Sequence, residues 1–472
     1  MTSAKAEKFD FIVIANRLPV DKVHTEDNTI EWKRSPGGLV TALMPVMQQN
    51  KGAWIGWDGD ADEKLKPFDQ EDMYLVPVPL TSEEVELYYE GFSNGTLWPL
   101  YHDVIVPPEF HRTWYDAYKE VNQRFADEAV KIADEGATIW VHDYQLQLVP
   151  QMIRKQRPDV KIGFFNHIPF PPIELFSQLP WRKQITEGVL GADVVGFQRP
   201  SDARNFISAI DKYTEASHAD EHTLKVKTGD GNQHECYVKA FPISIDATRI
   251  TQLANDPKII AAAAKIRHDL GNPNTIFFGV DRLDYTKGIR HRLKAFSECL
   301  NDGSLSVEDV TLIQVASPSR EHVDSYIQLR SEIEETVGRL NGKFSTVSKT
   351  AVHYIHRNVP LEEMVALYLA TDVMLVTSLR DGMNLVAKEY VATRQSESGV
   401  LILSEFTGAA DELKDAVMIN PHDITEMKNK MVKAAEMPAA EQQERMHNLR
   451  KYISENTVHD WAESFLSTLK RH

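Results

Sequence analysis

The feature that most constrains the fold of this 472-residue chain is a repeated alternation of short apolar runs with longer amphipathic stretches. The runs are rich in β-branched and aromatic residues and are apolar almost throughout, which is typical of strands that helices cover on both faces. The alternation therefore predicts an α/β fold with parallel, doubly wound sheets. The predicted strands are 9–15, 138–142, 160–165, 193–197, 276–280, 311–316, 351–355, 372–376 and 400–403, and the predicted helices include 289–300 and 361–370.

The chain is longer than the ~250–300 residues at which a single core stops growing, so we expect two domains. An extended, Pro-containing segment at 240–246 marks the junction and gives predicted domains 1–243 and 244–456. The last residues, 457–472, should form a helix that packs back on the N-terminal domain, because their apolar residues recur at helical spacing. The polar, Gly-containing segment 217–234 is expected to be a surface hairpin or loop. The apolar residues of the last helix are Val458, Trp461, Phe465 and Leu469.

Charge and cysteine usage disfavour several classes of partner. Asp and Glu number 69 against 52 Lys and Arg, and the formal net charge of -17 repels nucleic acid and anionic membrane surfaces. Cys236 and Cys299 lie far apart without a CxxC pair, which indicates free thiols in a reducing compartment. No apolar run approaches the ~18 residues of a membrane span or resembles a signal peptide, so we expect a cytoplasmic protein.

Ligands of doubly wound folds bind at the carboxyl ends of strands, and this rule directs the search for a site. Arg17 directly follows the first predicted strand, and Gly37 and Gly38 open the helical stretch after it. Paired glycines let the backbone approach a ligand, and a helix N-terminus offers N–H groups to a phosphate. A plain structural turn is the alternative, since the sequence has no GxGxxG or GxxxxGK(S/T) motif.

The predicted strand 276–280 is followed by Arg282 and Lys287, which flank a turn that ends in a glycine. Two cations at such a turn could neutralise a leaving diphosphate, which is the task of a divalent metal in other transferases. In the alternative interpretation, these cations form a solvated ion network with Asp281 and Asp284. The sequence lacks HExxH, zinc and GxSxG motifs, and no Asp-x-Asp follows the end of a predicted strand, so cations rather than a metal are expected at the diphosphate.

The segment 379–389 is the most specific stretch of the sequence. A glycine-containing loop after strand 372–376 leads into a helix whose first turn could offer N–H groups to a phosphate. Glu389, one to two turns into that helix, could accept hydrogen bonds from two ribose hydroxyls, and Asp381 could hold a sugar hydroxyl. A capped surface helix is the alternative.

Two further strand ends carry polar residues. His167 lies in a Pro-rich loop after strand 160–165, where a rigid backbone would fix its orientation, as electrostatic catalysis requires. Asp143, after strand 138–142, could bind an acceptor hydroxyl. The alternatives are a satisfied structural histidine and an aspartate that caps the next helix.

Aromatic and cationic residues complete the candidate set. Tyr89 and Trp98 belong to an expected turn-rich loop, whose exposed aromatic faces could pack on sugar rings or merely plug the core. Arg320, after strand 311–316, could join Arg17 in a forked contact with a phosphate dianion.

Together these stretches resemble the trehalose-6-phosphate synthase family, whose members are retaining glycosyltransferases of family 20. The resemblance covers nearly the whole chain and is carried most specifically by the motifs at 167–171, 282–288 and 380–389, with further likeness at 338–343 and 404–409. It implies the GT-B architecture, in which two facing Rossmann-like domains enclose the active site in a cleft. The acceptor side would be the N-terminal domain and the donor side the C-terminal domain.

The resemblance implies retaining transfer of glucose from a nucleotide-glucose, UDP-glucose foremost, to glucose 6-phosphate. The product would be α,α-trehalose 6-phosphate, in the first step of trehalose biosynthesis, with no cofactor or metal required. The implied catalytic residues are His167, Asp381, Arg282 and Lys287. The implied donor site consists of Gly37, Gly38, Arg282, Lys287, Val359, Leu385, Val386, Ala387, Lys388 and Glu389. The implied acceptor site consists of Arg17, Tyr89, Trp98, Asp143 and Arg320.

Two other interpretations stay open. A catalytically inactive homologue that senses sugar phosphate would show decayed motifs, whereas each candidate position except Val359 keeps a chemically competent residue. A dinucleotide-dependent dehydrogenase also has paired Rossmann-like domains, but the missing GxGxxG motif disfavours it. We expect small-molecule partners, with no nucleic acid and no membrane, and the sequence leaves the donor's base and a homo-oligomeric state open.

Overall fold

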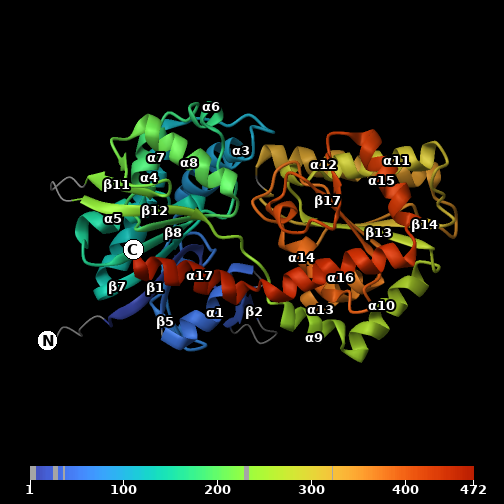
Figure 1. Ribbon diagram of the computed structural model, residues 1–472, viewed down its shortest axis with the longest axis horizontal. Coiled ribbons are helices and arrows are strands. Elements are labelled where there is room, and N and C mark those ends of the chain that lie inside the picture. Colours follow the sequence, from blue (N-terminus) through green and yellow to red (C-terminus); the bar gives the residue numbers. More distant parts are fainter. Residues whose placement is uncertain (1–6, 25–29, 36–37, 51, 228–232, 322) are drawn as a thin grey trace. The chain divides into compact units, whose positions relative to one another are not determined.

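The computed structural model describes residues 7–24, 30–35, 38–50, 52–227, 233–321 and 323–472. The described residues fall into two compact units: unit 1 combines Met1–Pro242 with His459–His472, and unit 2 is Ile243–Val458. Each unit has a mainly parallel sheet between layers of helices (Figure 1). The α/β class that the alternation predicts is therefore confirmed.

In the described part of unit 1, ten strands form one sheet. Side by side they are β10 (Ser217–His218), β11 (Thr223–Lys227), β12 (Gln233–Ala240), β9 (Val194–Phe197), β8 (Lys161–Phe165), β7 (Ala133–His142), β1 (Phe9–Arg17), β4 (Ala53–Trp57), β6 (Met73–Pro77) and β5 (Phe68–Gln70). A separate hairpin joins β2 (Val20–His24) to β3 (Ile30–Arg34). From β1 the chain proceeds outward to β4 and β6, and then from β7 outward to β12 on the other side. The strand order therefore reverses between β1 and β7, which is where doubly wound folds bind their ligands.

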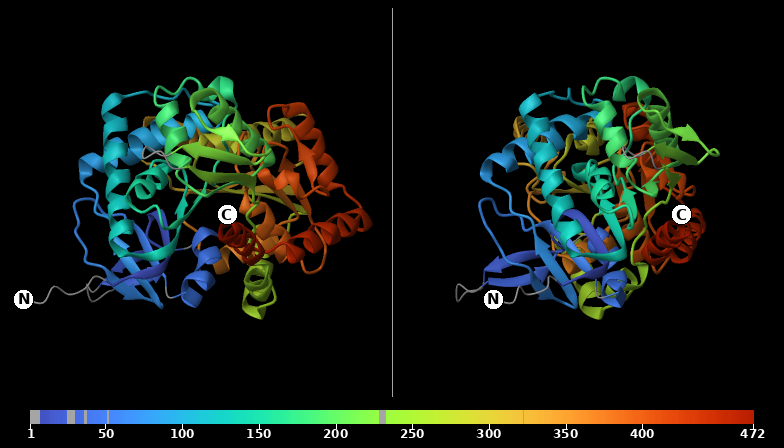
Figure 2. Two further views of the ribbon diagram at one scale, coloured as in Figure 1. Left: turned by 60° about the vertical axis from the view of Figure 1, so that its left-hand side comes forward. Right: turned by 90° about the vertical axis from the view of Figure 1, so that its left-hand side faces the viewer.

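Helices cover both faces of the unit 1 sheet. Figure 2 shows α1 and α17 on one side of the sheet and α4 on the other. The segment 217–234, expected as a hairpin or loop, contains the antiparallel pair β10 and β11 and the first residues of β12, which pairs with β11 and β9. The helices are α1 (Gly38–Asn50), α2 (Ser82–Glu84), α3 (Trp98–Tyr101), α4 (Arg112–Ile132), α5 (Val149–Gln156), α6 (Ile173–Phe176), α7 (Arg182–Val189), α8 (Pro200–Tyr213) and α17 (Val458–Arg471).

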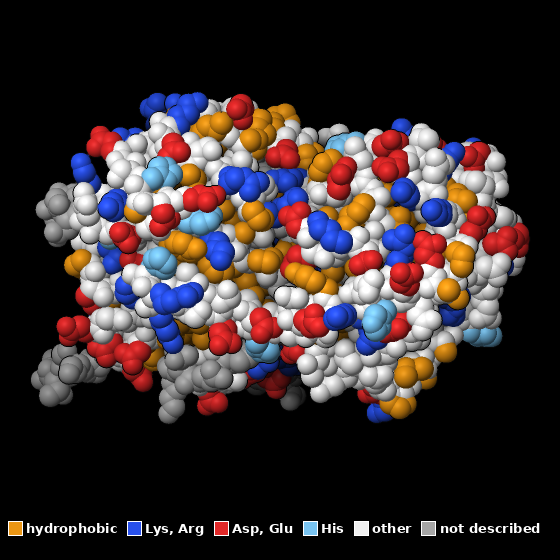
Figure 3. Space-filling model, viewed as in Figure 1, with side chains coloured by type: hydrophobic (Ala, Val, Ile, Leu, Met, Phe, Trp, Pro, Cys, Tyr) orange, Lys and Arg blue, Asp and Glu red, His pale blue; other side chains and the backbone are white. Residues whose placement is uncertain are grey.

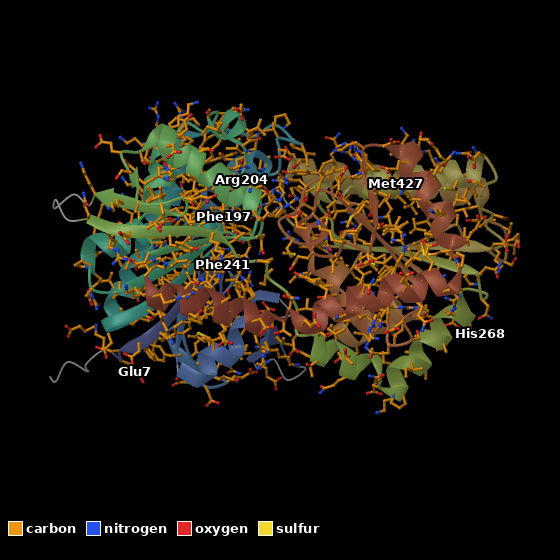
Figure 4. The ribbon with its side chains drawn as sticks, in the orientation of Figure 1. Glu7, Phe197, Arg204, Phe241, His268 and Met427 are labelled. Carbon is orange, nitrogen blue, oxygen red and sulfur yellow. The ribbon has the colours of Figure 1, made fainter. Side chains whose placement is uncertain are left out.

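The C-terminal helix α17 packs on the sheet of unit 1 through its aromatic residues. Phe465 stacks on Trp140 of β7, with ring centroids 4.5 Å apart and an interplanar angle of 5°. Space for this ring exists because β8 and β9 carry Gly163 and Gly196 there, where a Cβ would come within 2.6 Å and 2.9 Å of Phe465. Phe241, labelled in Figure 4, closes the cluster 5.1 Å from Phe465. Burial of these large rings against glycines anchors the end of the chain to unit 1.

In the described part of unit 2, six strands form a fully parallel sheet. Side by side they are β15 (Val352–Ile355), β14 (Val310–Ser317), β13 (Thr275–Arg282), β16 (Val373–Val376), β17 (Val400–Ser404) and β18 (Val417–Ile419). In chain order this sequence reads 3-2-1-4-5-6, the order of the dinucleotide-binding fold. The reversal lies between β13 and β16, so the loops after these two strands meet at one edge of the sheet.

Two groups of helices cover the faces of the unit 2 sheet (Figure 1). One group is α11 (Ile289–Asn301), α12 (Asp324–Phe344) and α15 (Ile424–Ala435). The other is α9 (Ala247–Ala254), α10 (Pro257–Asp269), α13 (Leu361–Ala370), α14 (Leu385–Thr393) and α16 (Ala439–Glu455). None of the helices that the structure describes, in either unit, has the length and apolarity needed to cross a lipid bilayer. The face shown in Figure 3 intersperses acidic and basic side chains over both units.

Candidate functional site

The loops after β13 and β16 are joined by an ion pair. Lys287 Nζ lies 2.6 Å from Asp381 Oδ2, and the two side chains are only 13% and 14% exposed. The same carboxylate oxygen accepts hydrogen bonds from Ser378 Oγ at 3.2 Å and from Asn384 Nδ2 at 3.1 Å. A cation and a carboxylate are thus held together at the strand-order reversal. There the cation can neutralise an incoming diphosphate while the carboxylate turns to sugar hydroxyls.

A glycine makes this close approach of the two loops possible. Gly288 has φ +66°, and a Cβ there would lie 2.1 Å from the carbonyl oxygen of Thr377. The hydroxyl of Thr377 in turn donates to the carbonyl oxygen of Lys287 at 3.2 Å. A side chain at position 288 would force the loops apart and add left-handed backbone strain of about 1–3 kcal/mol.

The turn before Gly288 is organised by Asp284, a buried carboxylate. Its Oδ1 accepts the backbone N–H of Thr286 at 2.9 Å, and its Oδ2 accepts a hydrogen bond from Arg320 Nη1 at 3.0 Å. Burial alone would raise the pKa of Asp284, but the charges of Arg320 and Arg282 outweigh it and lower the pKa. Arg282 itself is exposed at the end of β13. The predicted acceptor residue Arg320 is thus held in an ion pair, with 4% of its side chain exposed.

The first turn of α14 lies directly after Asp381. Asn384 adopts φ +90°, and its side-chain oxygen accepts the backbone N–H of Ala387 at 3.1 Å, which caps the helix. Leu385 and Val386, the first two residues of the helix, are half-buried. A helix N-terminus at this edge offers backbone N–H groups and a positive dipole end, the arrangement that binds phosphate groups.

The next two residues of α14 differ in what their side chains can do. Lys388 is fully buried; its Nζ contacts Glu412 at 2.7 Å and donates to the carbonyl oxygen of Ile243 at 2.7 Å, and burial lowers its pKa. This side chain anchors the helix, so only the backbone of Lys388 is available to a ligand. Glu389 accepts a hydrogen bond from the hydroxyl of Tyr368 at 2.8 Å, and burial raises its pKa. Tyr368 thus fixes one carboxylate oxygen of Glu389.

The remaining predicted donor residues are less informative. Val359 is half-buried in the loop between β15 and α13. Gly38 begins α1, whereas Gly37 lies outside the described residues.

In unit 1, a pocket of about 320 Å³ lies at the strand-order reversal between β1 and β7. The predicted acceptor residues Arg17, Tyr89 and Asp143 all line it. The Arg17 side chain is 47% exposed, 3.4 Å from Asp21, and its guanidinium lies 5.2 Å above the centre of the Trp57 ring. An exposed guanidinium on an aromatic ring is suited to a small anionic ligand.

Asp143, which lines this pocket, ties the loop after β7 to the loop after β8. It has φ +77°, and its Oδ1 accepts the backbone N–H of Tyr144 at 3.0 Å and that of His167 at 3.1 Å. His142 Nδ1 and His167 Nε2 lie 3.1 Å apart in a hydrogen bond. Burial lowers the pKa of His167 to about 3 and that of His142 well below its ordinary value. At neutral pH the two imidazoles are therefore uncharged.

The expectation of an exposed aromatic loop around Trp98 is wrong. Residues Val85–Leu97 form a π-helical stretch that continues into α3, and Trp98 is 4% exposed. The Trp98 ring packs 4.1 Å from His102, and Tyr89 is half-buried with its ring edge 5.7 Å from Trp57. The turn-forming residues of this segment suggested a loop, but burial of its aromatic residues favours a helix.

Sequence reasoning missed the residues that orient the candidates. Ser378 and Asn384 hold Asp381 by hydrogen bonds. Both residues follow the end of β16, so the rule that ligand sites lie after strands could have indicated them. Tyr368 and Tyr326 carried no signal, since each lies on a helix whose contacts depend on the tertiary fold.

Among the described residues, one group of carboxylates has the spacing of a metal site: Asp58, Asp60 and Glu63. Lys22 Nζ contacts all three, at 2.8 Å from Asp58, 2.9 Å from Asp60 and in a short contact with Glu63. Although burial disfavours its charge, these carboxylates raise the pKa of Lys22. An ammonium group already occupies the cluster and offsets part of its negative charge.

The chain is similar to known proteins over nearly its whole length. The profile of Glycosyltransferase family 20 matches residues 9–471. The trehalose-6-phosphate synthase of Mycolicibacterium smegmatis is 52% identical over 464 residues, which are 98% of this chain and 92% of that protein. A UDP-forming α,α-trehalose-phosphate synthase from Burkholderia xenovorans, solved in complex with glucose-6-phosphate, is 32% identical, with a TM-score of 0.88 and coverage of 98% of this chain and 99% of that chain. A structure from E. coli bound with UDP-2-fluoro glucose is 31% identical, with the same TM-score of 0.88 and coverage of 98% and 99%. The likeness to these structures confirms the predicted GT-B fold class.

Proposed function

The chain belongs to glycosyltransferase family 20, and from this membership we propose that it transfers glucose from a nucleotide-glucose, preferably UDP-glucose, to glucose 6-phosphate. The products are α,α-trehalose 6-phosphate and the nucleoside diphosphate. The observation that carries the proposal is the Lys287–Asp381 pair, which combines a diphosphate-neutralising cation with a sugar-binding carboxylate at one strand-order reversal. The solved relatives with UDP-2-fluoro glucose and with glucose-6-phosphate support the two substrates.

On the donor side, Lys287 exchanges Asp381 for the diphosphate, and Arg282 adds a second positive charge. Asp381, released from the lysine, accepts hydrogen bonds from the glucose hydroxyls. The first turn of α14 presents its N–H groups to a phosphate, and Glu389, oriented by Tyr368, accepts those of the ribose. These groups stabilise negative charge as the bond between glucose and diphosphate breaks.

On the acceptor side, Arg17 binds the phosphate of glucose 6-phosphate, and Tyr89 and Asp143 bind its sugar ring. Arg320 contributes a second guanidinium, while Trp98, which is buried, supports the acceptor site indirectly. His167 serves the donor glucose as a neutral group, because its pKa of about 3 keeps it uncharged. The acceptor hydroxyl attacks the glucose on the face that the diphosphate leaves, and a leaving phosphate oxygen takes its proton, so the configuration is retained.

The test is a comparison of UDP-, GDP- and ADP-glucose, each incubated with the purified protein and glucose 6-phosphate. We expect the fastest release of nucleoside diphosphate from UDP-glucose and, by NMR, a product with both glycosidic centres in the α configuration. Release of nucleoside diphosphate that does not depend on glucose 6-phosphate, or no release from any donor, would overturn the proposal.

A further inference from the structure

The carboxylate of Asp284 accepts hydrogen bonds from two different segments of unit 2. Its Oδ1 accepts the backbone N–H of Thr286, inside the 3₁₀ turn Tyr285–Lys287 that ends at the proposed diphosphate-binding lysine. Its Oδ2 accepts hydrogen bonds from Arg320 Nη1 at 3.0 Å and from the hydroxyl of Tyr326 at 3.0 Å. The side chain of Asp284 is completely buried, so it contacts these groups and not solvent.

The surroundings of Arg320 hold it in an unusual conformation. Its backbone has φ +48°, a left-handed value that residues other than glycine rarely adopt. Its guanidinium also lies 5.2 Å above the ring of Tyr326 and makes a short hydrogen bond with the hydroxyl of that residue. The backbone N–H of Val323 donates to the carbonyl oxygen of Arg320 at 3.0 Å, which turns the chain so that Tyr326 returns to the arginine. Such a conformation persists only where neighbouring groups fix it.

We infer that Asp284 is the positioning residue for acceptor binding: it fixes the guanidinium of Arg320 in the orientation in which this group meets the phosphate of glucose 6-phosphate. This inference rests on the proposed function and on the acceptor role of Arg320. An arginine held in place by a buried carboxylate loses little rotamer freedom when it binds a phosphate, so binding is tighter. Asp284 acts through Arg320 and does not touch the substrate.

The charge balance supports the same role. An unpaired aspartate beside Lys287 would repel both the diphosphate and the acceptor phosphate, whereas the ion pair with Arg320 cancels that charge inside the protein. Because Oδ1 caps the turn while Oδ2 holds the arginine, the two functions of this carboxylate can be separated by a substitution that changes one oxygen.

The decisive variant is Asp284→Asn, in which the side-chain oxygen can still accept the N–H of Thr286. Its amide nitrogen replaces the oxygen that faces Arg320 and Tyr326 and cannot accept their hydrogen bonds. We expect the KM for glucose 6-phosphate to rise about 10- to 100-fold, the effect of losing a charge-assisted hydrogen bond. The KM for UDP-glucose should stay nearly constant. Tyr326→Phe, which keeps the ion pair, should raise the KM for glucose 6-phosphate by a smaller factor.

Unit 1 offers a control, because Asp193 also joins a backbone N–H and an arginine and lies outside both proposed sites. It is buried, and its Oδ2 accepts the backbone N–H of Ile162 at 2.7 Å and a hydrogen bond from Arg154 Nη2 at 2.6 Å. Asp193→Asn should lower the melting temperature but leave both KM values unchanged. This control separates the loss of a buried ion pair from the loss of acceptor positioning.

Each outcome decides the inference. If Asp284→Asn raises both KM values equally or neither, the carboxylate only supports the loop and the inference is overturned. If this variant does not fold, an unchanged KM for glucose 6-phosphate in Tyr326→Phe overturns it instead. If the unmodified protein fails to turn over any nucleotide-glucose with glucose 6-phosphate, the proposed function itself fails and the inference falls with it.

Discussion

The two strand-order reversals of the molecule hold their charged groups in opposite ways. In unit 2, Lys287 and Asp381 are in contact at 2.6 Å and largely buried, and Asp284 and Arg320 form a second buried pair. In unit 1, the Arg17 side chain is 47% exposed, and its contact with Asp21 is longer, at 3.4 Å. One doubly wound architecture thus carries a fixed charge network in one unit and an open pocket with an accessible cation in the other. The fixed Lys287–Asp381 pair suits the stabilisation of a developing diphosphate, and the accessible Arg17 suits capture of a diffusing phosphate ester.

The largest effect should come from breaking the fixed network of unit 2. Lys287→Met removes the ammonium while keeping a chain of similar length, so the charge that develops on the leaving diphosphate is no longer neutralised. We expect kcat to fall about 10²- to 10³-fold, the usual effect of removing one preorganised group that stabilises charge in the transition state. Steady-state kinetics with saturating UDP-glucose and glucose 6-phosphate measures this loss.

A lysine in a more exposed pair provides the control for this variant. Lys428 on α15 contacts Asp302 at 2.6 Å, away from both strand-order reversals. Since surface pairs contribute about 0–1 kcal/mol, Lys428→Met should leave kcat unchanged. Equal activity of Lys287→Met and the unmodified protein would show that the Lys287–Asp381 pair is purely structural.

The middle-sized effect concerns the two uncharged histidines that follow β7 and β8 in unit 1. Burial keeps His142 and His167 uncharged, so their pKa values in the folded protein lie below the ~6.5 of an unfolded chain. Below about pH 6.5 the unfolded state binds protons that the folded state excludes, and the free energy of unfolding falls by up to about 1.4 kcal/mol per pH unit for each histidine. Above that pH neither histidine contributes a slope. Urea unfolding between pH 7.5 and pH 5 measures this dependence.

The variant His142→Asn isolates this contribution, because asparagine can keep the hydrogen bond toward His167 but does not titrate. We expect its stability to fall less steeply than that of the unmodified protein as the pH drops below 6.5. If the free energy of unfolding depended on pH in the same way in both proteins, the folded state would accommodate a charged imidazole at position 142, and the expectation of two neutral histidines would be wrong.

The sequence located the strands of this fold well where the local pattern was strong. Each predicted apolar run coincides with a strand, as 276–280 does with β13 and 400–403 with β17. The strands β4 and β6 were missed, because Gly56 and Pro77 weaken their local signal. Their pairing depends on the tertiary fold, as when Val13 of β1 aligns with Trp54 of β4.

The candidate site was predictable only as positions, not as partners. The strand-end rule pointed to Lys287 and Asp381, which lie on different loops, but their ion pair depends on the order of strands in the sheet. Proximity in the sequence favours an alternative ion network, in which Arg282 and Lys287 pair with Asp281 and Asp284. The structure instead pairs Asp281 with Arg292 at 2.8 Å and Asp284 with Arg320. The substrate roles of these residues stay predictions.

The smallest expected effect is that of metal removal, and it tests whether cations do in unit 2 what a metal does in other transferases. Lys22 in unit 1 occupies the carboxylate cluster of Asp58, Asp60 and Glu63, so a divalent ion would have to displace an ammonium that these carboxylates stabilise. In the proposed function, Lys287 and Arg282 of unit 2 supply the positive charge for the diphosphate. We therefore expect the same kcat and KM values with excess chelator as with added Mg²⁺. Activity that disappears with chelator and returns with Mg²⁺ would show that the cations of unit 2 are insufficient. A bound metal ion would then have to neutralise the diphosphate together with the fixed charges of unit 2.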